Sequence, residues 1–186
     1  MGDNFKNQVI ADILSKEGGY VNDPSDSGGE TNYGITSAVA KSNGYKDSIR
    51  DMPKQVAFNI YENIYWCSVS ASAVSALSEL VTGELVDTAV NMGPKRAGII
   101  LQRCLNVLND QGRLYPDITV DGKVGPATLS SLGSYLSRRS EGVMVRAMNC
   151  LQGAFYIELA ERREKDERFV YGWLKNRINL HGGVFE

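Results

Sequence analysis

Histidine is almost absent from this sequence of 186 residues, which holds His181 alone. Zinc hydrolases and enzymes with Ser-His or Cys-His catalysis need an imidazole that is better placed than one in a glycine-rich tail. The three cysteines, Cys67, Cys104 and Cys150, are far apart and odd in number. This spacing argues against a disulfide framework or a CxxC metal site and indicates a reducing compartment during synthesis. We therefore expect no metal, and we expect any catalysis to depend on carboxyl groups.

A strong net charge and long apolar runs are also missing. Twenty Lys and Arg residues against 22 Asp and Glu residues leave a net charge of −2 with histidine neutral, which argues against a strongly basic nucleic-acid binder. The apolar runs are shorter than the roughly 20 residues of a membrane-spanning helix, so we expect no stable membrane insertion. The first residues lack the basic and apolar segments of a signal peptide. The 42% of hydrophobic side chains fits one or two globular domains.

Apolar residues recur with a helical period along most of the chain. We predict helices over Phe5–Lys16, from Thr36 to Asn43, and over Asp51–Trp66, Leu77–Met92, Ala97–Leu108, Pro126–Leu136 and Glu141–Arg168. Gly18 supplies a left-handed stop for the first helix, and Thr36 can cap the second. The Ser/Ala-rich stretch Ser68–Ala76 is the best linker candidate, with a poorly amphipathic helix as the alternative. An aromatic tail that contains Trp173 is expected to pack after the last helix.

Residues 20–36 have a different composition, rich in Asp, Asn, Ser and Gly, with turn signals at Asp23-Pro24 and Ser27-Gly28-Gly29. Such a segment predicts a loop or short β-hairpin folded over the end of the first helix. Together with the helical periods, it predicts the α+β class, predominantly α.

Glu17 and Asp26 form a candidate pair of catalytic carboxyl groups. Glu17 stands at the last turn of the first predicted helix, where the partial negative charge of the helix C-terminus favours a neutral carboxyl that can donate a proton. Asp26 follows in a polar loop that hydrates an ionised carboxylate easily. Hydrolysis of a glycosidic bond requires such an acid and base, and Thr31 could hydrogen-bond the attacking water. Helix-end and turn-forming roles are the structural alternative for these residues.

The segment from Glu17 to Thr36, EGGYVNDPSDSGGETNYGIT, resembles the signature of glycoside hydrolase family 108, the phage and bacterial N-acetylmuramidases. The resemblance continues through Tyr65-Trp66, Leu85–Gly93 and Val120–Thr128. It implies a lysozyme-like catalytic region over residues 1–93. A helical region, the predicted peptidoglycan-binding region, follows over residues 94–186 and is expected to pack into one compact unit with the first.

The resemblance implies that Glu17 is the catalytic acid for the β-1,4 bond between N-acetylmuramic acid and N-acetylglucosamine. The layout also resembles that of phage-type lysozymes, where an Asp and then a Thr follow this Glu. Glu17 and Asp26 reproduce the first spacing, whereas Thr31 comes one residue early. In this interpretation Asp26 accepts a proton from water, and we expect inversion at the anomeric carbon by analogy. No cofactor is implied.

Four further residues are candidates for binding the sugar chain. Tyr20 and Tyr33 flank the loop and could stack on sugar faces, with half-buried packing as the alternative. Asp87 and Asn91 are four residues apart on one predicted helix face. They could both point into a cleft, or they could form a helix-end hydrogen-bond network before Gly93.

The expected protein is a phage endolysin that acts on peptidoglycan as a monomer. Without an export signal it would accumulate in the host cytoplasm and need a holin or similar pore to reach the wall. Two other functions fit the same residues. A lytic transglycosylase uses one catalytic Glu and releases 1,6-anhydro products, and a wall-binding protein would have no catalysis.

Overall fold

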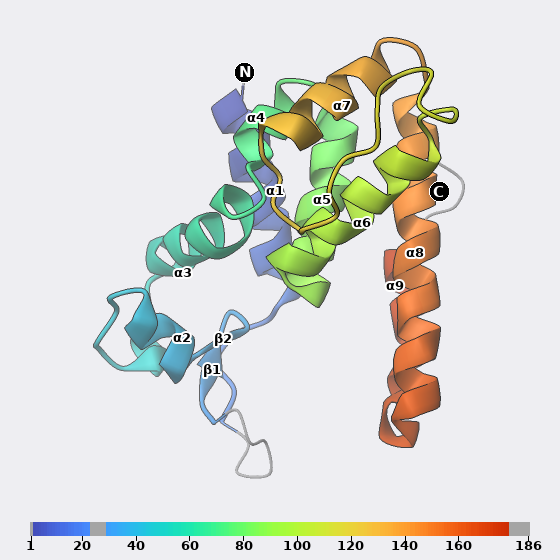
Figure 1. Ribbon diagram of the computed structural model, residues 1–186. Coiled ribbons are helices and arrows are strands. Elements are labelled where there is room, and N and C mark those ends of the chain that lie inside the picture. Colours follow the sequence, from blue (N-terminus) through green and yellow to red (C-terminus); the bar gives the residue numbers. More distant parts are fainter. Residues whose placement is uncertain (1, 23–28, 179–186) are drawn as a thin grey trace. The chain divides into compact units, whose positions relative to one another are not determined.

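The computed structural model describes residues 2–22 and 29–178. Within them the chain forms helices and one small antiparallel sheet of two strands, β1 (Thr31–Asn32) and β2 (Ile35–Thr36) (Figure 1). This confirms the predicted α+β class, predominantly α, with a short hairpin inside residues 20–36. Residue contacts divide the chain into two compact units, residues 1–68 and 69–186, and each has its own buried apolar residues.

The first unit is built around two helices and the hairpin. In chain order its elements are α1 (Gly2–Lys16), β1, β2, α2 (Ser37–Ser42), the 3-10 turn η1 (Ile49–Asp51), α3 (Lys54–Tyr61) and the π-helical segment η2 (Glu62–Cys67). Helix α1 packs against α3. The rings of Phe5 and Trp66 meet edge to face with centroids 6.1 Å apart, and Lys6 Nζ lies 2.7 Å from Glu62 Oε1.

Local signals fix the ends of these elements. Gly18 adopts a φ of +78° directly after α1, and Thr36 Oγ1 accepts a hydrogen bond of 3.2 Å from the N–H of Val39 at the start of α2, so the predicted stop and cap are confirmed. The buried Asn32 joins the hairpin to η1, because its Nδ2 donates to the carbonyl oxygens of Ile49 at 2.9 Å and Arg50 at 3.1 Å. The hairpin is thereby held within the first unit.

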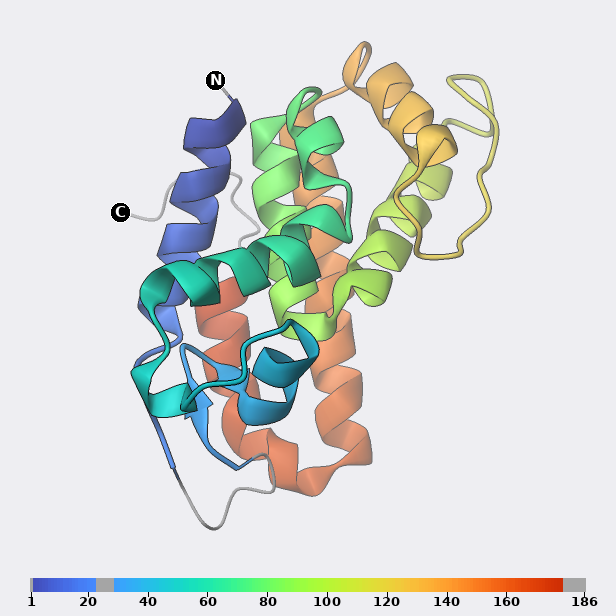
Figure 2. The ribbon, with the colours of Figure 1, turned by 90° about the vertical axis from the view of Figure 1, so that its left-hand side faces the viewer.

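The second unit is a helical assembly. Its elements are α4 (Ala71–Ser75), α5 (Glu79–Met92), α6 (Pro94–Val107), α7 (Pro126–Leu136), α8 (Glu141–Arg162), the 3-10 turn η3 (Glu164–Asp166) and α9 (Glu167–Arg177). Helix α5 packs against α4, α6 and α8, and α9 runs alongside α8 (Figure 2). The core of this unit includes Leu85, Leu101, Leu105, Leu132 and Met148, all of which are fully buried.

Three predicted segments were wrong in their extent or type. The helix predicted over Asp51–Trp66 begins at Lys54 and becomes π-helical at Glu62. The preferred linker Ser68–Ala76 contains helix α4, because Ala71 and Val74 are buried in the second unit. The helix predicted to end at Arg168 ends at Arg162, and the aromatic tail forms part of α9.

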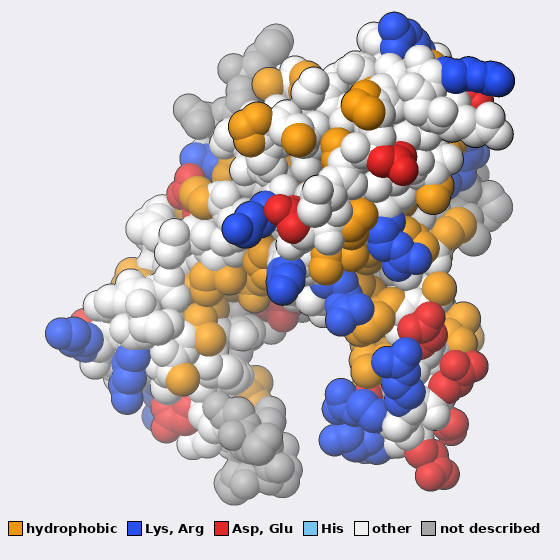
Figure 3. Space-filling view, viewed as in Figure 1, with side chains coloured by type: hydrophobic (Ala, Val, Ile, Leu, Met, Phe, Trp, Pro, Cys, Tyr) orange, Lys and Arg blue, Asp and Glu red, His pale blue; other side chains and the backbone are white. Residues whose placement is uncertain are grey.

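The surface of the described residues carries both signs of charge. On the face shown in Figure 3, Lys and Arg side chains are interspersed with Asp and Glu side chains. In the part of the chain that the structure describes, no helix combines the length and apolar character needed to cross a bilayer.

Candidate active site

Glu17 lies where the first helix ends. Its backbone N–H donates to the carbonyl of Ile13 at 3.2 Å, so Glu17 continues the last turn of α1, and Gly18 then turns the chain away. The side chain is half-buried. Glu17 is therefore held by a regular helix but keeps access to solvent, as a proton donor to a polymeric substrate requires.

The hairpin turn closes over the Glu17 carboxyl. Tyr33 and Gly34 connect β1 and β2 with φ values of +52° and +70°, the combination that two-residue hairpin turns of type I′ require. A Cβ atom added to Gly34 would lie 2.8 Å from Oε2 of Glu17 and 3.0 Å from the hydroxyl oxygen of Tyr61. Glycine at this position thus allows the backbone of the hairpin to approach the carboxyl closely.

Two tyrosines from α3 and η2 complete the surroundings of Glu17. The hydroxyl of Tyr61 donates to the carbonyl of Tyr33 at 3.0 Å, and the ring centroids of Tyr61 and Tyr65 lie 5.2 Å apart. Burial raises the pKa of both phenols, and the negative charge of Glu17 raises them further. Both hydroxyls therefore stay protonated at neutral pH.

Tyr61 was missed in the sequence, and Gly34 and Tyr65 were noted only as parts of the resembling motif. One signal was present, since Tyr61 and Tyr65 are four residues apart and such residues share a helix face. The spacing identifies a pair but says nothing about what the pair faces. That information comes from contacts between residues distant in the sequence.

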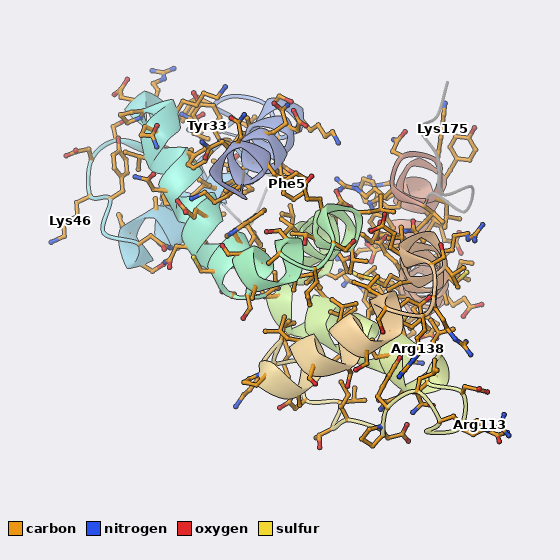
Figure 4. The ribbon with its side chains drawn as sticks, turned by 90° about the horizontal axis from the view of Figure 1, so that it is seen from above. Phe5, Tyr33, Lys46, Arg113, Arg138 and Lys175 are labelled. Atoms are coloured by element: carbon orange, nitrogen blue, oxygen red, sulfur yellow. The ribbon has the colours of Figure 1, made fainter. Side chains whose placement is uncertain are left out.

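The hairpin also carries Thr31 and Tyr33, and Tyr20 precedes it. Thr31 is half-buried in β1, pairs with Thr36, and exchanges two backbone hydrogen bonds of 2.9 Å with Val21. Tyr33 is half-buried and lies beside α1 and α3 (Figure 4). The guanidinium of Arg50 stands 5.0 Å from the centroid of the Tyr20 ring, so one face of that ring has a cation as its neighbour. The structure thus places Thr31 and Tyr33 on the hairpin that contacts Glu17.

Asp26, the predicted base, lies outside the described residues. Among the residues that are described, no group of three or more His, Cys, Asp or Glu side chains could hold a metal ion. The chemistry that the described site offers is that of one carboxyl with phenol donors beside it.

Asp87 and Asn91 lie on α5 in the second unit and contact each other. Nδ2 of Asn91 donates to Oδ2 of Asp87 at 2.9 Å and to its backbone carbonyl at 2.8 Å. Nη1 of Arg177, on α9, stands 3.7 Å from Oδ1 of Asp87. Both α5 residues are half-buried, so they form a polar network that solvent can reach.

Two segments of this chain match known protein families. Residues 10–93 match the family model described as Glycosyl hydrolase 108, and residues 96–178 match the model described as Predicted Peptidoglycan domain. Residues 10–93 belong to glycosyl hydrolase family 108. The two matches support a glycoside hydrolase with a peptidoglycan-degrading function and peptidoglycan as its substrate partner.

The family 108 region contains Glu17 and the residues around it that are described above. It begins in α1, includes the hairpin and α3, and ends at Gly93 after α5, so it also includes Asp87 and Asn91. The predicted peptidoglycan domain covers most of α6 and continues through α9 to residue 178.

A solved structure shares the fold of this chain. The chain is similar to the structure of Brucella abortus SagA, with a TM-score of 0.63 and 23% sequence identity over 95% of this chain and 98% of that chain. This likeness supports the α+β, predominantly α fold. No curated protein matches the chain significantly.

Proposed function

We propose that the protein is an N-acetylmuramidase that hydrolyses the β-1,4 bond between N-acetylmuramic acid and N-acetylglucosamine, with Glu17 as the general acid. The observation that supports this most directly is the half-buried carboxyl of Glu17 at the end of α1, in close contact with the backbone of Gly34, which also approaches the Tyr61 hydroxyl. This arrangement lies inside the family 108 region. It supplies a proton donor at a fixed position, which acid-catalysed cleavage of a glycosidic bond needs.

In the proposed reaction, Glu17 donates its proton to the glycosidic oxygen while the bond from that oxygen to C1 breaks. Asp26 accepts a proton from a water molecule that Thr31 hydrogen-bonds, and the hydroxide oxygen forms the new bond to C1. The carboxyl groups regain their starting protonation by exchange with solvent. We propose inversion, which requires a gap of about 6.5–9.5 Å between the two carboxyl groups to hold the water. Proton NMR of the first product would show the α anomer, and an initial β anomer would contradict inversion.

Tyr20, Tyr33, Asp87 and Asn91 are the proposed contacts to the sugar chain, within a catalytic region of residues 1–93. Residues 94–186 are the proposed wall-binding region, and we expect the chain to act as a monomer. The support for the division is the position of the two family matches, which meet between residues 93 and 96.

We further propose that the enzyme is a phage endolysin, made in the host cytoplasm and released to the wall through a holin. The resemblance to phage muramidases supports this role. Expression in a Gram-negative host tests it: lysis should require a co-expressed holin or a membrane-permeabilising agent, and lysis of intact cells by the enzyme alone would contradict the role.

The cleavage chemistry is tested by the products. Sacculi digested with the full chain should release muropeptides that end in reducing N-acetylmuramic acid, which mass spectrometry distinguishes from 1,6-anhydro ends by the mass of one water. Anhydro ends would show a lytic transglycosylase instead. Sacculi that stay uncut would indicate a wall-binding protein without catalysis.

A further inference from the structure

A cavity of about 600 Å³ lies in the second unit, where the loop that follows α6 meets the start of α7. Its volume is in the range of small-molecule binding sites. Short apolar and charged side chains line it together, among them Pro116, Asp117, Ile118, Asp121, Lys123 and Ala127. All of them belong to the region that matches the predicted peptidoglycan domain, and nothing in the proposed glycan cleavage uses them.

The walls of the cavity are pre-formed by amide side chains from one face of α6. Gln102 is only 1% exposed. Its Nε2 donates to Oδ1 of Asp121 at 2.9 Å and to the carbonyl of Lys123 at 3.0 Å, and its Oε1 accepts from the N–H of Gly122 at 2.7 Å. A buried amide that holds three points of one loop fixes the conformation of that loop.

The next amides along the same helix face act in the same way. Asn106 donates to the carbonyl of Ile118 at 2.8 Å and accepts from its N–H at 2.9 Å. Asn109, just beyond the helix end, donates to Oδ1 of Asp117 at 2.6 Å. Positions 102, 106 and 109 follow the spacing of one helix face. Arg138, which follows α7 and is labelled in Figure 4, donates a hydrogen bond of 3.1 Å to the carbonyl of Leu114 in the same loop.

The charges at the cavity are fixed as well. Asp121 accepts hydrogen bonds from Gln102 and from the backbone N–H of Lys123 at 2.8 Å, and these bonds hold the pKa of the Asp121 carboxyl below its usual value. Asp121 is therefore ionised at neutral pH. The cavity thus offers two carboxylates, from Asp117 and Asp121, and the ammonium group of Lys123, beside short apolar side chains.

We propose that this cavity binds the peptide stem of peptidoglycan. This inference rests on the proposed function for its choice of polymer. Stem peptides present small apolar side chains, free carboxylates and an amine, and each has a counterpart here: the apolar lining, Lys123, and the pair of Asp117 and Asp121. A sugar ring fits less well, because none of the described residues that line the cavity is aromatic and so none offers a ring for stacking.

The site is tested with soluble probes on the full chain. The free tripeptide L-Ala-γ-D-Glu-meso-diaminopimelate and a trimer of N-acetylglucosamine are titrated separately by calorimetry. Lys123→Met removes the ammonium group, and Ala127→Trp fills the cavity with an indole. Lys165→Met and Ala73→Trp are the matched controls, at exposed positions of the second unit that do not line the cavity.

The wild-type chain and both controls should bind the tripeptide equally. Lys123→Met should raise the Kd for the tripeptide about tenfold or more, the effect of losing a charge-assisted contact. Ala127→Trp should raise it by at least as much, because the indole occupies the space of the ligand. Thermal unfolding establishes that each variant is folded, and Lys123→Met keeps the test decisive if Ala127→Trp does not fold. A wild-type chain that does not bind the tripeptide, or cavity variants that bind it as tightly as the controls, would overturn the proposal. So would an equal loss of binding to the sugar trimer.

The digestion of sacculi separates this inference from the proposed function. If the wild-type chain releases muropeptides but does not bind the tripeptide, only the peptide site is wrong. If it releases none but binds the tripeptide with the predicted variant effects, the cleavage proposal is wrong and the peptide site stands.

Discussion

The carboxyl of Glu17 and the backbone of Gly34 are in such close contact that a Cβ atom on residue 34 would lie 2.8 Å from Oε2 of Glu17. The same atom would lie 3.0 Å from the hydroxyl oxygen of Tyr61. The end of α1, the hairpin turn and α3 therefore meet at one point where no side chain fits. The geometry of the candidate site depends on this contact.

Gly34→Ala should lower the activity strongly and destabilise the first unit. The new methyl group must displace the Glu17 carboxyl or the hairpin, and alanine at a φ of +70° adds about 1–2 kcal/mol of backbone strain. Lysis rates and urea unfolding measure the two effects. Gly44→Ala is the matched control, because Gly44 has a φ of +88° and open space around its Cα. It should show the strain alone, and equal losses of activity in the two variants would contradict a role for the contact.

Tyr61→Phe should lower the free energy of unfolding by about 1 kcal/mol, because the carbonyl of Tyr33 loses its hydrogen bond of 3.0 Å. It should also reduce kcat, since the hairpin is no longer held against Glu17 from this side. Tyr135→Phe is the control, as it removes a hydroxyl that donates to the carbonyl of Ser140 at 2.9 Å, away from the candidate site, and leaves the bond to Tyr33 in place. Steady-state kinetics and chemical unfolding give both quantities. A kcat for Tyr61→Phe equal to that of the control would show that this hydrogen bond does not position the site.

Glu84 gives the second unit a dependence on pH. Its carboxyl lies on α5 and accepts a hydrogen bond of 3.2 Å from Thr88. It also interacts with Asn149 on α8. Thr88 and Asn149 are both fully buried. Burial raises the pKa of Glu84 to about 7, the charge of Asp87 adds to the rise, and the hydrogen bonds from Asn149 and Thr88 oppose it. The pKa in the folded state is thus above the ordinary value of 4.5.

A folded-state pKa raised in this way stabilises the fold at low pH. The contribution is complete below pH 4.5 and is lost as pH rises to about 7, a total of about 3 kcal/mol at 1.36 kcal/mol per pKa unit. Urea unfolding between pH 4.5 and 8 should show this fall in the wild-type chain and a flatter profile in Glu84→Gln. Glu79→Gln, exposed on the same helix, should keep the wild-type profile. Identical slopes for wild type and Glu84→Gln would contradict the prediction.

Asp87→Asn tests the proposed sugar contact on α5. The ion pair of Asp87 with Arg177 spans 3.7 Å and is partly exposed, so its loss should change the free energy of unfolding by less than about 1 kcal/mol. If Asp87 binds a sugar hydroxyl, KM should rise by about tenfold, the effect of losing one charged hydrogen bond. Arg177→Gln, which breaks only the ion pair, is the control. An unchanged KM in Asp87→Asn would remove Asp87 from the binding site.

The sequence predicts those features of the fold that depend on neighbouring residues. The stop at Gly18 and the cap at Thr36 are local, and both are present. The end of α8 at Arg162 is not local. Residues 161–167 are all charged and include neither Gly nor Pro, so the helical pattern continues through them. The break occurs because α9 folds back on α8 and brings the ring of Trp173 within 5.2 Å of the Tyr156 ring.

The same distinction applies to the candidate site. Glu17 can be predicted, because a carboxyl before two glycines at a helix end has a local signature. Gly34 and Tyr61 cannot be assigned from local patterns, because their roles come from a contact among positions 17, 34 and 61. The burial of Glu84 also depends on residues of α8 more than 60 positions away.

The most direct measurement for the central claim is the rate at which Glu17→Gln lyses permeabilised Gram-negative cells. The amide keeps the size of the side chain and removes the acidic proton, so the rate should fall by about 100-fold or more. Its free energy of unfolding should stay within about 1 kcal/mol of wild type. Glu30→Gln, an exposed carboxyl in the segment before the hairpin, should lyse at the wild-type rate. A folded Glu17→Gln variant that lyses cells as fast as wild type would show that Glu17 is not the acid.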